Sequence, residues 1–125
     1  MDLNDISGKI VNVAYEIHQG LGPGLFESVY EMIMFDQLTE AGFRVNRQVT
    51  FPVYYHSKKY QTGFRVDMLV NSVVIVEVKS VESLQPVHYK QLLTYLRLMN
   101  IKLGLLINFN EEFIKNGLRR VVNQL

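Results

Sequence analysis

Two continuous apolar segments, VVIVEVKS at residues 73–80 and LGLLINF at residues 103–109, most constrain the fold of this chain. Each has the length of a strand and carries apolar residues at consecutive positions, which is typical of a strand buried on both faces of a sheet. A helical pattern runs between them from about Val87 to Met99, and Pro86 is well placed at its start. A strand, a helix and a strand in this order predict a right-handed crossover between parallel neighbouring strands.

The rest of the chain supplies further helical and strand patterns. Apolar residues recur every three or four positions near the N-terminus until GLGPG at residues 20–24, which cannot continue a helix. We expect a single domain, residues 1–125, with an α/β fold in which a mixed four-stranded sheet is flanked by helices. The further predicted elements are a second helix at 25–41, strands at 45–55 and 60–70 with a turn at 56–59, and a closing helix at 111–123.

Composition limits the environment in which the chain works. No run of about eighteen uncharged apolar residues exists, and the N-terminus MDLNDISGKI is too polar for a secretory signal. The chain has no cysteine, which excludes disulfides and thiolate metal sites and fits a reducing compartment. We therefore expect a cytoplasmic protein with no membrane partner. The net charge of +1 leaves the partner open, and no helix-turn-helix, zinc finger or aromatic stacking platform is recognisable.

The hairpin formed by FRVDMLV at residues 64–70 and the apolar strand 73–80 can pair in two registers. A two-residue loop pairs residues whose numbers sum to 143 and scatters charged side chains over both faces. A three-residue loop makes the sum 144, which places Asp67 opposite Glu77 and leaves the other face apolar. Because burial favours an apolar face, we predict the three-residue loop.

Two carboxylates placed opposite each other, with side-chain bases about 5 Å apart, repel unless one is protonated or a cation lies between them. The same register places Arg65 opposite Lys79, so the four charges could simply neutralise one another on a partly solvated sheet face. The alternative is a site for Mg²⁺ or Mn²⁺, which prefer oxygen ligands. Lys79 beside such an ion would orient a nucleophilic water or stabilise charge on a phosphate.

The pattern of Asp67 followed on the next strand by Glu77, Val78 and Lys79 resembles the D…(D/E)xK core of the PD-(D/E)xK nuclease superfamily. One position departs, because the proline that precedes the aspartate in the superfamily is Val66 here. Other segments resemble the GxxExxY family, a bacterial and archaeal branch of that superfamily: GLFESVY at 24–30 matches its G-x-x-E-x-x-Y signature, and IHQGLGPG at 17–24, PVHYKQLLTYL at 86–96 and GLLINF at 104–109 are similar to it.

This resemblance implies a restriction-endonuclease-like αβββαβ core and a nuclease that depends on Mg²⁺ or Mn²⁺. It implies metal ligands at Asp67, at Glu77 and at the backbone carbonyl of Val78, with Lys79 as a catalytic lysine. It also implies a third carboxylate, Glu27, from the helix before the sheet. Taken alone, Glu27 is a first-turn glutamate that the helix dipole favours.

Further candidates lie on the two helices next to the sheet. His88, Gln91 and Tyr95 fall at i, i+3 and i+7 on one helix face. Gln91 and Tyr95 match the Q-x-x-x-Y-L pattern of the family and could line the cleft; the same stripe could instead pack on the sheet. Tyr30 follows Glu27 by one turn, and we expect it to orient that glutamate.

These residues predict a Mg²⁺-dependent nuclease that hydrolyses phosphodiester bonds, with DNA favoured over RNA as the nucleic acid partner. The alternative is a non-catalytic module that retains the fold and binds nucleic acid or protein. Hydrolysis of small phosphoesters is a third interpretation, which the small open domain disfavours. A domain of this size could cut both strands of a duplex as a homodimer or by nicking twice.

Overall fold

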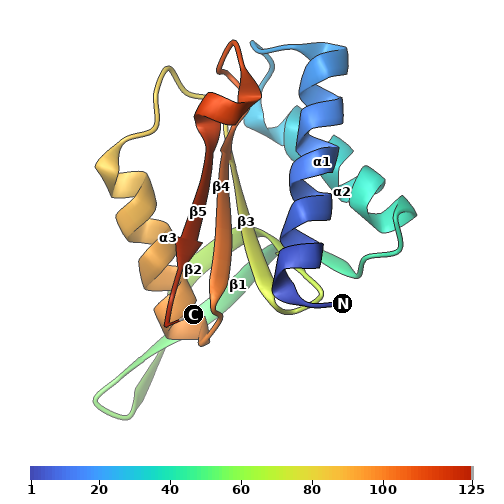
Figure 1. Cartoon of the computed structure of the whole chain (residues 1–125). Coiled ribbons are helices and arrows are strands. Elements are labelled where there is room, and N and C mark those ends of the chain that lie inside the picture. The colour runs from blue at the N-terminus through green and yellow to red at the C-terminus, as the bar shows by residue number, and fades with distance from the viewer. Residues whose placement is uncertain (125) are drawn as a thin grey trace.

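A computed structural model describes residues 1–124 of the chain, apart from the side chain of Thr62. Helices α1 and α2 cover one face of a five-stranded sheet and α3 covers the other (Figure 1). The elements are α1 (Leu3–Leu21), α2 (Glu27–Glu40), β1 (Val45–Tyr55), β2 (Lys58–Val70), β3 (Val74–Lys79), α3 (Pro86–Met99), β4 (Leu103–Asn108), a 3₁₀ helix η1 (Ile114–Gly117) and β5 (Leu118–Val122). The expected α/β fold is confirmed, with one strand more than predicted.

Local sequence signals explain where the helices begin and end. The side chain of Asp2 accepts a hydrogen bond from the backbone N–H of Asp5 (2.9 Å) and caps the start of α1. Gly22 ends α1 with a φ of 70°, a conformation that glycine adopts at low cost. Pro86 is the first residue of α3, and Asn100 ends α3 in the left-handed conformation. Within residues 1–124, no helix combines the length and the apolar character needed to cross a membrane.

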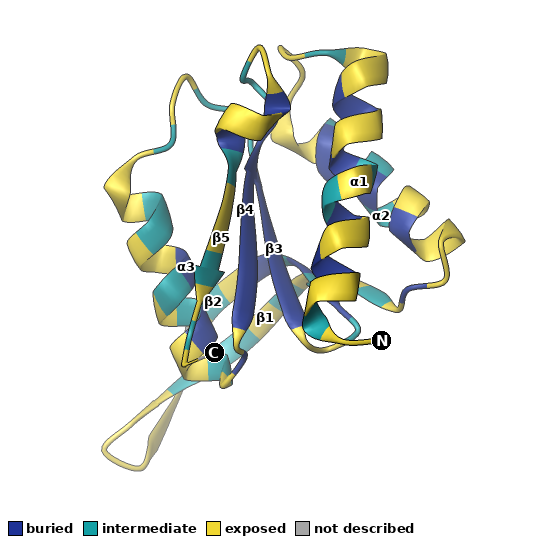
Figure 2. Cartoon of the chain, in the orientation of Figure 1, coloured by how far each residue is buried: buried dark blue, intermediate teal, exposed yellow. Residues whose placement is uncertain are grey.

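The two apolar strands that dominate the sequence form the centre of the sheet. β3 and β4 pair in parallel, from Val74 opposite Leu103 to Lys79 opposite Asn108, and α3 connects them. Figure 2 shows both strands almost wholly buried between the helical layers. The predicted parallel crossover is therefore confirmed.

The hairpin of β2 and β3 has the predicted three-residue loop. Met68 pairs with Val76 and Val70 with Val74, so paired numbers sum to 144. The ladder ends at Met68 and Val76, and the expected pairing of Arg65 with Lys79 does not form. Arg65 instead lies opposite Thr50 of β1. The physical reason is that the side chains of Asp67 and Glu77 accept the backbone hydrogen bonds beyond Val76.

The predicted single apolar face of β2 is wrong, because the strand changes layer at Asp67. Met68 and Val70 pack in the cluster under α1 and α2, whereas Phe64 and Val66 pack in the cluster under α3. The pairing of β1 with β2 is interrupted at the same point, where Gln48 has a φ of 50°. A residue in that conformation turns the strand, so the side chains before and after it point to different layers.

Two further predictions, one of a turn and one of a helix, also need correction. The turn between β1 and β2 contains two residues, His56 and Ser57, with φ of 51° and 61°, and not the four residues 56–59. Residues 111–123 form η1 and β5 in place of a helix. A Cβ on Gly117 would lie 2.5 Å from the Asn108 carbonyl oxygen, so only glycine fits this close turn. The β-branched residues that follow pair with the open edge of β4.

The packing of α3 gives a test of this arrangement. Leu96 is fully buried against the sheet, whereas Leu98 on the same helix is 51% exposed. Leu96→Ala should lower the free energy of unfolding by about 2–4 kcal/mol through lost burial and a residual cavity. The control Leu98→Ala should change it by less than about 0.5 kcal/mol. Urea unfolding followed by circular dichroism measures both, and equal effects would contradict the placement of α3.

Candidate metal and catalytic site

Asp67 and Glu77 lie side by side where the ladder between β2 and β3 stops. The backbone N–H of Asp67 donates to Glu77 Oε2 (2.9 Å), and the N–H of Val78 donates to Asp67 Oδ2 (2.8 Å). Each carboxylate therefore replaces the carbonyl that a continuing ladder would offer. Glu77 is 6% exposed and Asp67 is half-buried. The meeting of these two acids, predicted from the hairpin register, is confirmed.

The two carboxylates are electrostatically strained. Burial, followed by the negative charge of Asp67, raises the pKa of Glu77 from 4.5 to about 8. Burial likewise raises the pKa of Asp67, although the hydrogen bond from Val78 opposes the shift. The positive charge of Lys79 lowers both pKa values, but it is the smallest contribution to either. The pair therefore favours a bound proton or cation near neutral pH.

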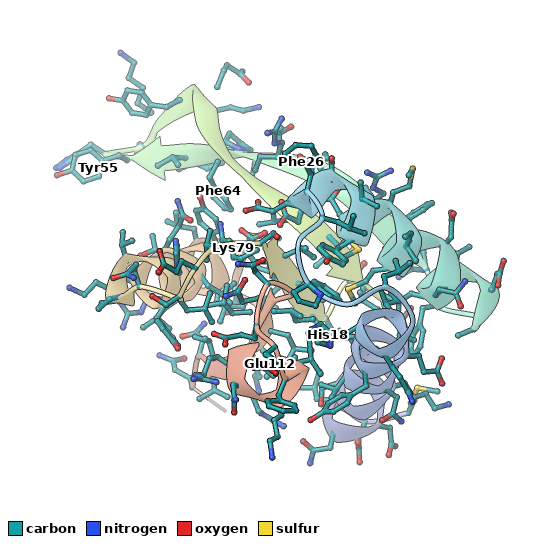
Figure 3. The ribbon with its side chains drawn as sticks, turned by 90° about the horizontal axis from the view of Figure 1, so that it is seen from above. His18, Phe26, Tyr55, Phe64, Lys79 and Glu112 are labelled. Carbon is teal, nitrogen blue, oxygen red and sulfur yellow. The ribbon has the colours of Figure 1, made fainter. Side chains whose placement is uncertain are left out.

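The four-charge cluster that would neutralise itself does not form. Arg65 is exposed and lies on the β1 side of β2, and Lys79 makes no ion pair with either carboxylate. In the described part of the chain, the ion pairs consist of Arg47 with Glu31. Lys79 is half-buried at the end of β3 (Figure 3), and its amine forms no ion pair with a described residue.

Glu27 lies beside the carboxylate pair without joining it. Its Oε2 accepts a hydrogen bond from the backbone N–H of Ser80 (3.2 Å), just beyond β3. Among residues 1–124, no three acidic or histidine side chains converge in the way that a metal ion requires. The reason is that α2 packs on the Val78 face of β3, while the side chain of Glu77 points to the α3 face.

The oxygen atoms at the carboxylate pair nevertheless fit a hard divalent cation. Asp67 and Glu77 offer two adjacent carboxylates that their own repulsion leaves short of positive charge. The N–H and C=O of one strand residue point to the same side, so the carbonyl of Val78 faces Asp67 as its N–H does. Mg²⁺ commonly takes one or two carboxylates and keeps several waters, so these three groups are a sufficient protein ligand set.

A second polar cluster next to Asp67 could not be recognised from the sequence. Glu31 of α2 is 5% exposed and accepts hydrogen bonds from Arg47 Nη2 (2.9 Å) and Gln48 Nε2 (2.7 Å). Its negative charge contributes to the raised pKa of Asp67. The guanidinium of Arg47 also lies over the ring of Phe35, 5.5 Å from its centre. The only signal in the sequence is that Glu31 follows Glu27 by one helical turn.

Two members of the predicted stripe on α3, Tyr95 and His88, have different surroundings. Burial raises the pKa of Tyr95 most, and the charges of Glu77 and then Asp67 raise it further, so its hydroxyl lies within the electrostatic field of the carboxylates. Gln91 is exposed one turn earlier on the same helix. The Nδ1 of His88 accepts a hydrogen bond from the N–H of Gln85 (2.9 Å) and so caps α3. Of the predicted stripe, His88 therefore caps the helix, whereas Tyr95 responds to the charge of the carboxylates.

Tyr30 lies in the core and does not line a cleft. It is fully buried and stacks on Phe109 with ring centroids 4.4 Å apart. Its hydroxyl donates to the carbonyl of Gly22 and accepts from the N–H of Leu25 (3.2 Å). It makes no hydrogen bond to Glu27 in the described structure, so it fixes the loop that precedes α2 instead.

The carboxylate pair lies outside a groove on the α1 side of the sheet. A groove of about 600 Å³ between α1 and β5 is lined by residues that include Tyr15, Leu105 and Arg120, and neither carboxylate contributes to it. The site instead occupies the sheet surface between β2, the end of β3 and α3, which suits an extended substrate better than an enclosed small molecule.

Comparison with known proteins gives one match. A family model described as the PD-(D/E)XK nuclease superfamily matches residues 4–121. This range includes both carboxylates, Lys79 and the whole of α3. No curated protein and no solved structure matches the chain.

The raised pKa of Glu77 predicts how stability depends on pH in a chelating buffer. The folded chain holds this proton more tightly than the unfolded chain, so the stabilisation is complete below pH 4.5 and is lost as the pH rises through about 8. The melting temperature of the wild type should fall by about 5 °C or more relative to Glu77→Gln across this range. Calorimetry from pH 5 to 8.5 measures the difference. Glu82→Gln, at an exposed position after β3, is the control. Parallel curves for the wild type and Glu77→Gln would contradict the prediction.

Proposed function

The chain belongs to the PD-(D/E)XK nuclease superfamily, and from this premise we propose that it hydrolyses phosphodiester bonds of nucleic acid with the help of a divalent metal ion. The observation that carries the proposal is the pair of backbone hydrogen bonds at the carboxylates: Glu77 accepts from the N–H of Asp67, and Asp67 accepts from the N–H of Val78. Two strained carboxylates next to an amine without an ion pair are the groups that such a reaction uses.

We assign the metal to Asp67, Glu77 and the carbonyl of Val78, with Glu27 as the third carboxylate of the region. Mg²⁺ or Mn²⁺ bound there would supply positive charge against the phosphate in the transition state. Glu27 is anchored on Ser80 in the described structure, which keeps a carboxylate within the same end of the sheet. Its role as a ligand is part of the proposal.

Lys79 is assigned to the catalytic step. Alternation along β3 places its side chain on the same face as Glu77, two residues away. Its ammonium would donate to the attacking water or to a phosphate oxygen, which orients the nucleophile and stabilises developing charge. Gln91 lies one helical turn before Tyr95 on α3, and we propose that both hold the phosphate or a water.

We further propose DNA, in preference to RNA, as the substrate, and the GxxExxY branch as the place of the chain within the superfamily. GLFESVY at residues 24–30 supports the branch, and in this segment Tyr30 holds the loop and Glu27 reaches the end of β3. Cleavage of both strands of a duplex would require a homodimer or two successive nicks.

Metal binding gives the first test. Titration of Mn²⁺ into the wild type at pH 7.5 should produce a binding heat with a stoichiometry of about one ion per chain. Asp67→Asn should weaken binding by at least about tenfold, because a ligand charge is removed. Glu82→Gln, an exposed acid outside the pair, should bind as the wild type does. Absence of heat in the wild type would refute the metal site.

Catalysis gives the second test. Plasmid, single-stranded DNA and RNA are incubated with Mg²⁺ or Mn²⁺, and the initial rate of cleavage is measured. Lys79→Ala should lower that rate by about 10²–10⁴-fold, the usual contribution of a positioned proton-transfer group. Lys102→Ala, at an exposed position, is the matched control. Cleavage that persists in Lys79→Ala and Glu77→Ala would come from a contaminant. Metal binding without cleavage would favour the alternative of a non-catalytic binding module.

A further inference from the structure

The hairpin of β1 and β2 extends well beyond the sheet as a two-stranded arm, here defined as residues 52–63 (Figure 1). Its base is marked by a shift of register between Phe51 and Val53. A Cβ on Gly63 would lie 1.9 Å from the carbonyl oxygen of Phe51, so glycine is required where the two strands come together. At the outer end, the tight turn at His56 and Ser57 closes the arm.

The arm exposes three tyrosine rings. Tyr54 and Tyr55 are each 65% exposed and Tyr60 is 44% exposed. The pairs Val53–Tyr60 and Tyr55–Lys58 place Tyr55, Lys58 and Tyr60 on one face of the ribbon. The Nζ of Lys58 lies 5.4 Å from the ring centre of Tyr60, so an aromatic surface and a cation are held together.

The other face of the arm repeats this combination. Tyr54 lies opposite Lys59 in the ladder, so the two side chains share a face. At the tip, the rings of His56 and Tyr55 pack edge to face with their centroids 4.3 Å apart. Aromatic rings and lysines therefore surround the end of the arm.

Charge is distributed very unevenly along this chain. Residues 41–66 contain five Lys and Arg and no Asp or Glu, although the whole chain has a net charge of +1. The other residues therefore carry eight Lys and Arg against twelve Asp and Glu, a net charge of −4. Of the five cations, Arg47 alone forms an ion pair within the described part of the chain. Two of the five, Lys58 and Lys59, lie in the arm, which contains no acidic residue, so the arm presents positive charge that a polyanion would neutralise.

The base of the arm adjoins the candidate site through stacked aromatic rings. The ring centroids of Phe51 and Phe64 are 5.6 Å apart and those of Phe64 and Tyr95 are 4.5 Å apart, and the negative charge of Glu77 acts on the hydroxyl of Tyr95. Figure 3 shows Phe64 between Lys79 and the outer end of the arm, where Tyr55 lies. At about 3.3 Å per residue, the arm reaches roughly 17 Å beyond Phe51, a span of several nucleotides.

We propose that the arm binds a single-stranded segment of the nucleic acid substrate, with unpaired bases stacked on Tyr54, Tyr55 and Tyr60 and phosphates neutralised by Lys58 and Lys59. The inference rests on the proposed function and deepens it by naming the substrate class. Stacking on exposed rings requires free base faces, which a duplex keeps covered. A second copy of the chain is a poor occupant, because joining two arms would bring their lysines together.

Fluorescence anisotropy in a chelating buffer tests the stacking. The probes are a fluorescein-labelled oligo-thymidine of about twelve nucleotides and a duplex of the same length. Tyr55→Ala/Tyr60→Ala should weaken binding of the single strand by about tenfold or more and that of the duplex by less than about twofold. Tyr55→Phe/Tyr60→Phe keeps the rings and should bind as the wild type does. Phe113→Ala, an aromatic residue 60% exposed outside the arm, is the matched control and should not change binding.

The same assay tests the lysines through the salt dependence of binding. Lys58→Gln/Lys59→Gln should reduce the slope of log affinity against log salt by about 1.4 for the single strand, since two phosphate contacts are lost. Lys9→Gln/Lys102→Gln removes two exposed lysines elsewhere and should leave the slope unchanged. Unaltered binding in Tyr55→Ala/Tyr60→Ala, or an equal loss for the duplex, would overturn the inference. Because the chelator prevents metal-dependent cleavage, this result is independent of whether the chain is an active nuclease.

Discussion

The hydrogen bonds that Asp67 and Glu77 exchange with the backbone, at the point where β2 and β3 separate, organise the rest of the structure. They satisfy backbone N–H groups that would otherwise be buried without partners, so the ladder can end inside the sheet. Beyond this point β2 leaves β3 and follows β1 toward the α3 layer. The end of this ladder brings the two carboxylates together, with the carbonyl of Val78 on their side of β3. It also frees β2 to continue with β1 toward the arm.

This arrangement has an electrostatic cost that the surrounding layers make larger. The helices on both faces remove water from β3, and burial is accordingly the largest cause of the raised pKa values of Asp67 and Glu77. Glu31 adds a third negative charge near Asp67, and Arg47 and Gln48 hold it in place. In our proposal this concentration of acids attracts the cation that acts on the phosphate.

The site and the arm together describe a path for an extended substrate. The carboxylates and Lys79 lie at the end of β3, Tyr95 borders them, and stacked rings lead through Phe64 to the base of the arm. Lys58 and Lys59 lie at the outer end of this path, in the arm, whereas the residues outside 41–66 are net negative. In our proposal the arm holds unpaired bases while the sheet supplies the chemistry, which separates recognition from cleavage within one small chain.

The central crossover, the three-residue hairpin loop and the meeting of Asp67 with Glu77 could be predicted from the amino-acid sequence, because strand periodicity and loop length are local properties. The remaining features of the fold and of the site depend on how distant segments of the chain pack together. Residues 111–123 form η1 and β5 because the edge of β4 is available for pairing. Glu27 accepts a hydrogen bond from Ser80 because α2 packs on the sheet face opposite to Glu77. The cluster around Glu31 and the tyrosine surface of the arm also arise from segments brought together by folding. Contacts of that kind depend on where whole elements pack, which no local pattern of residues encodes.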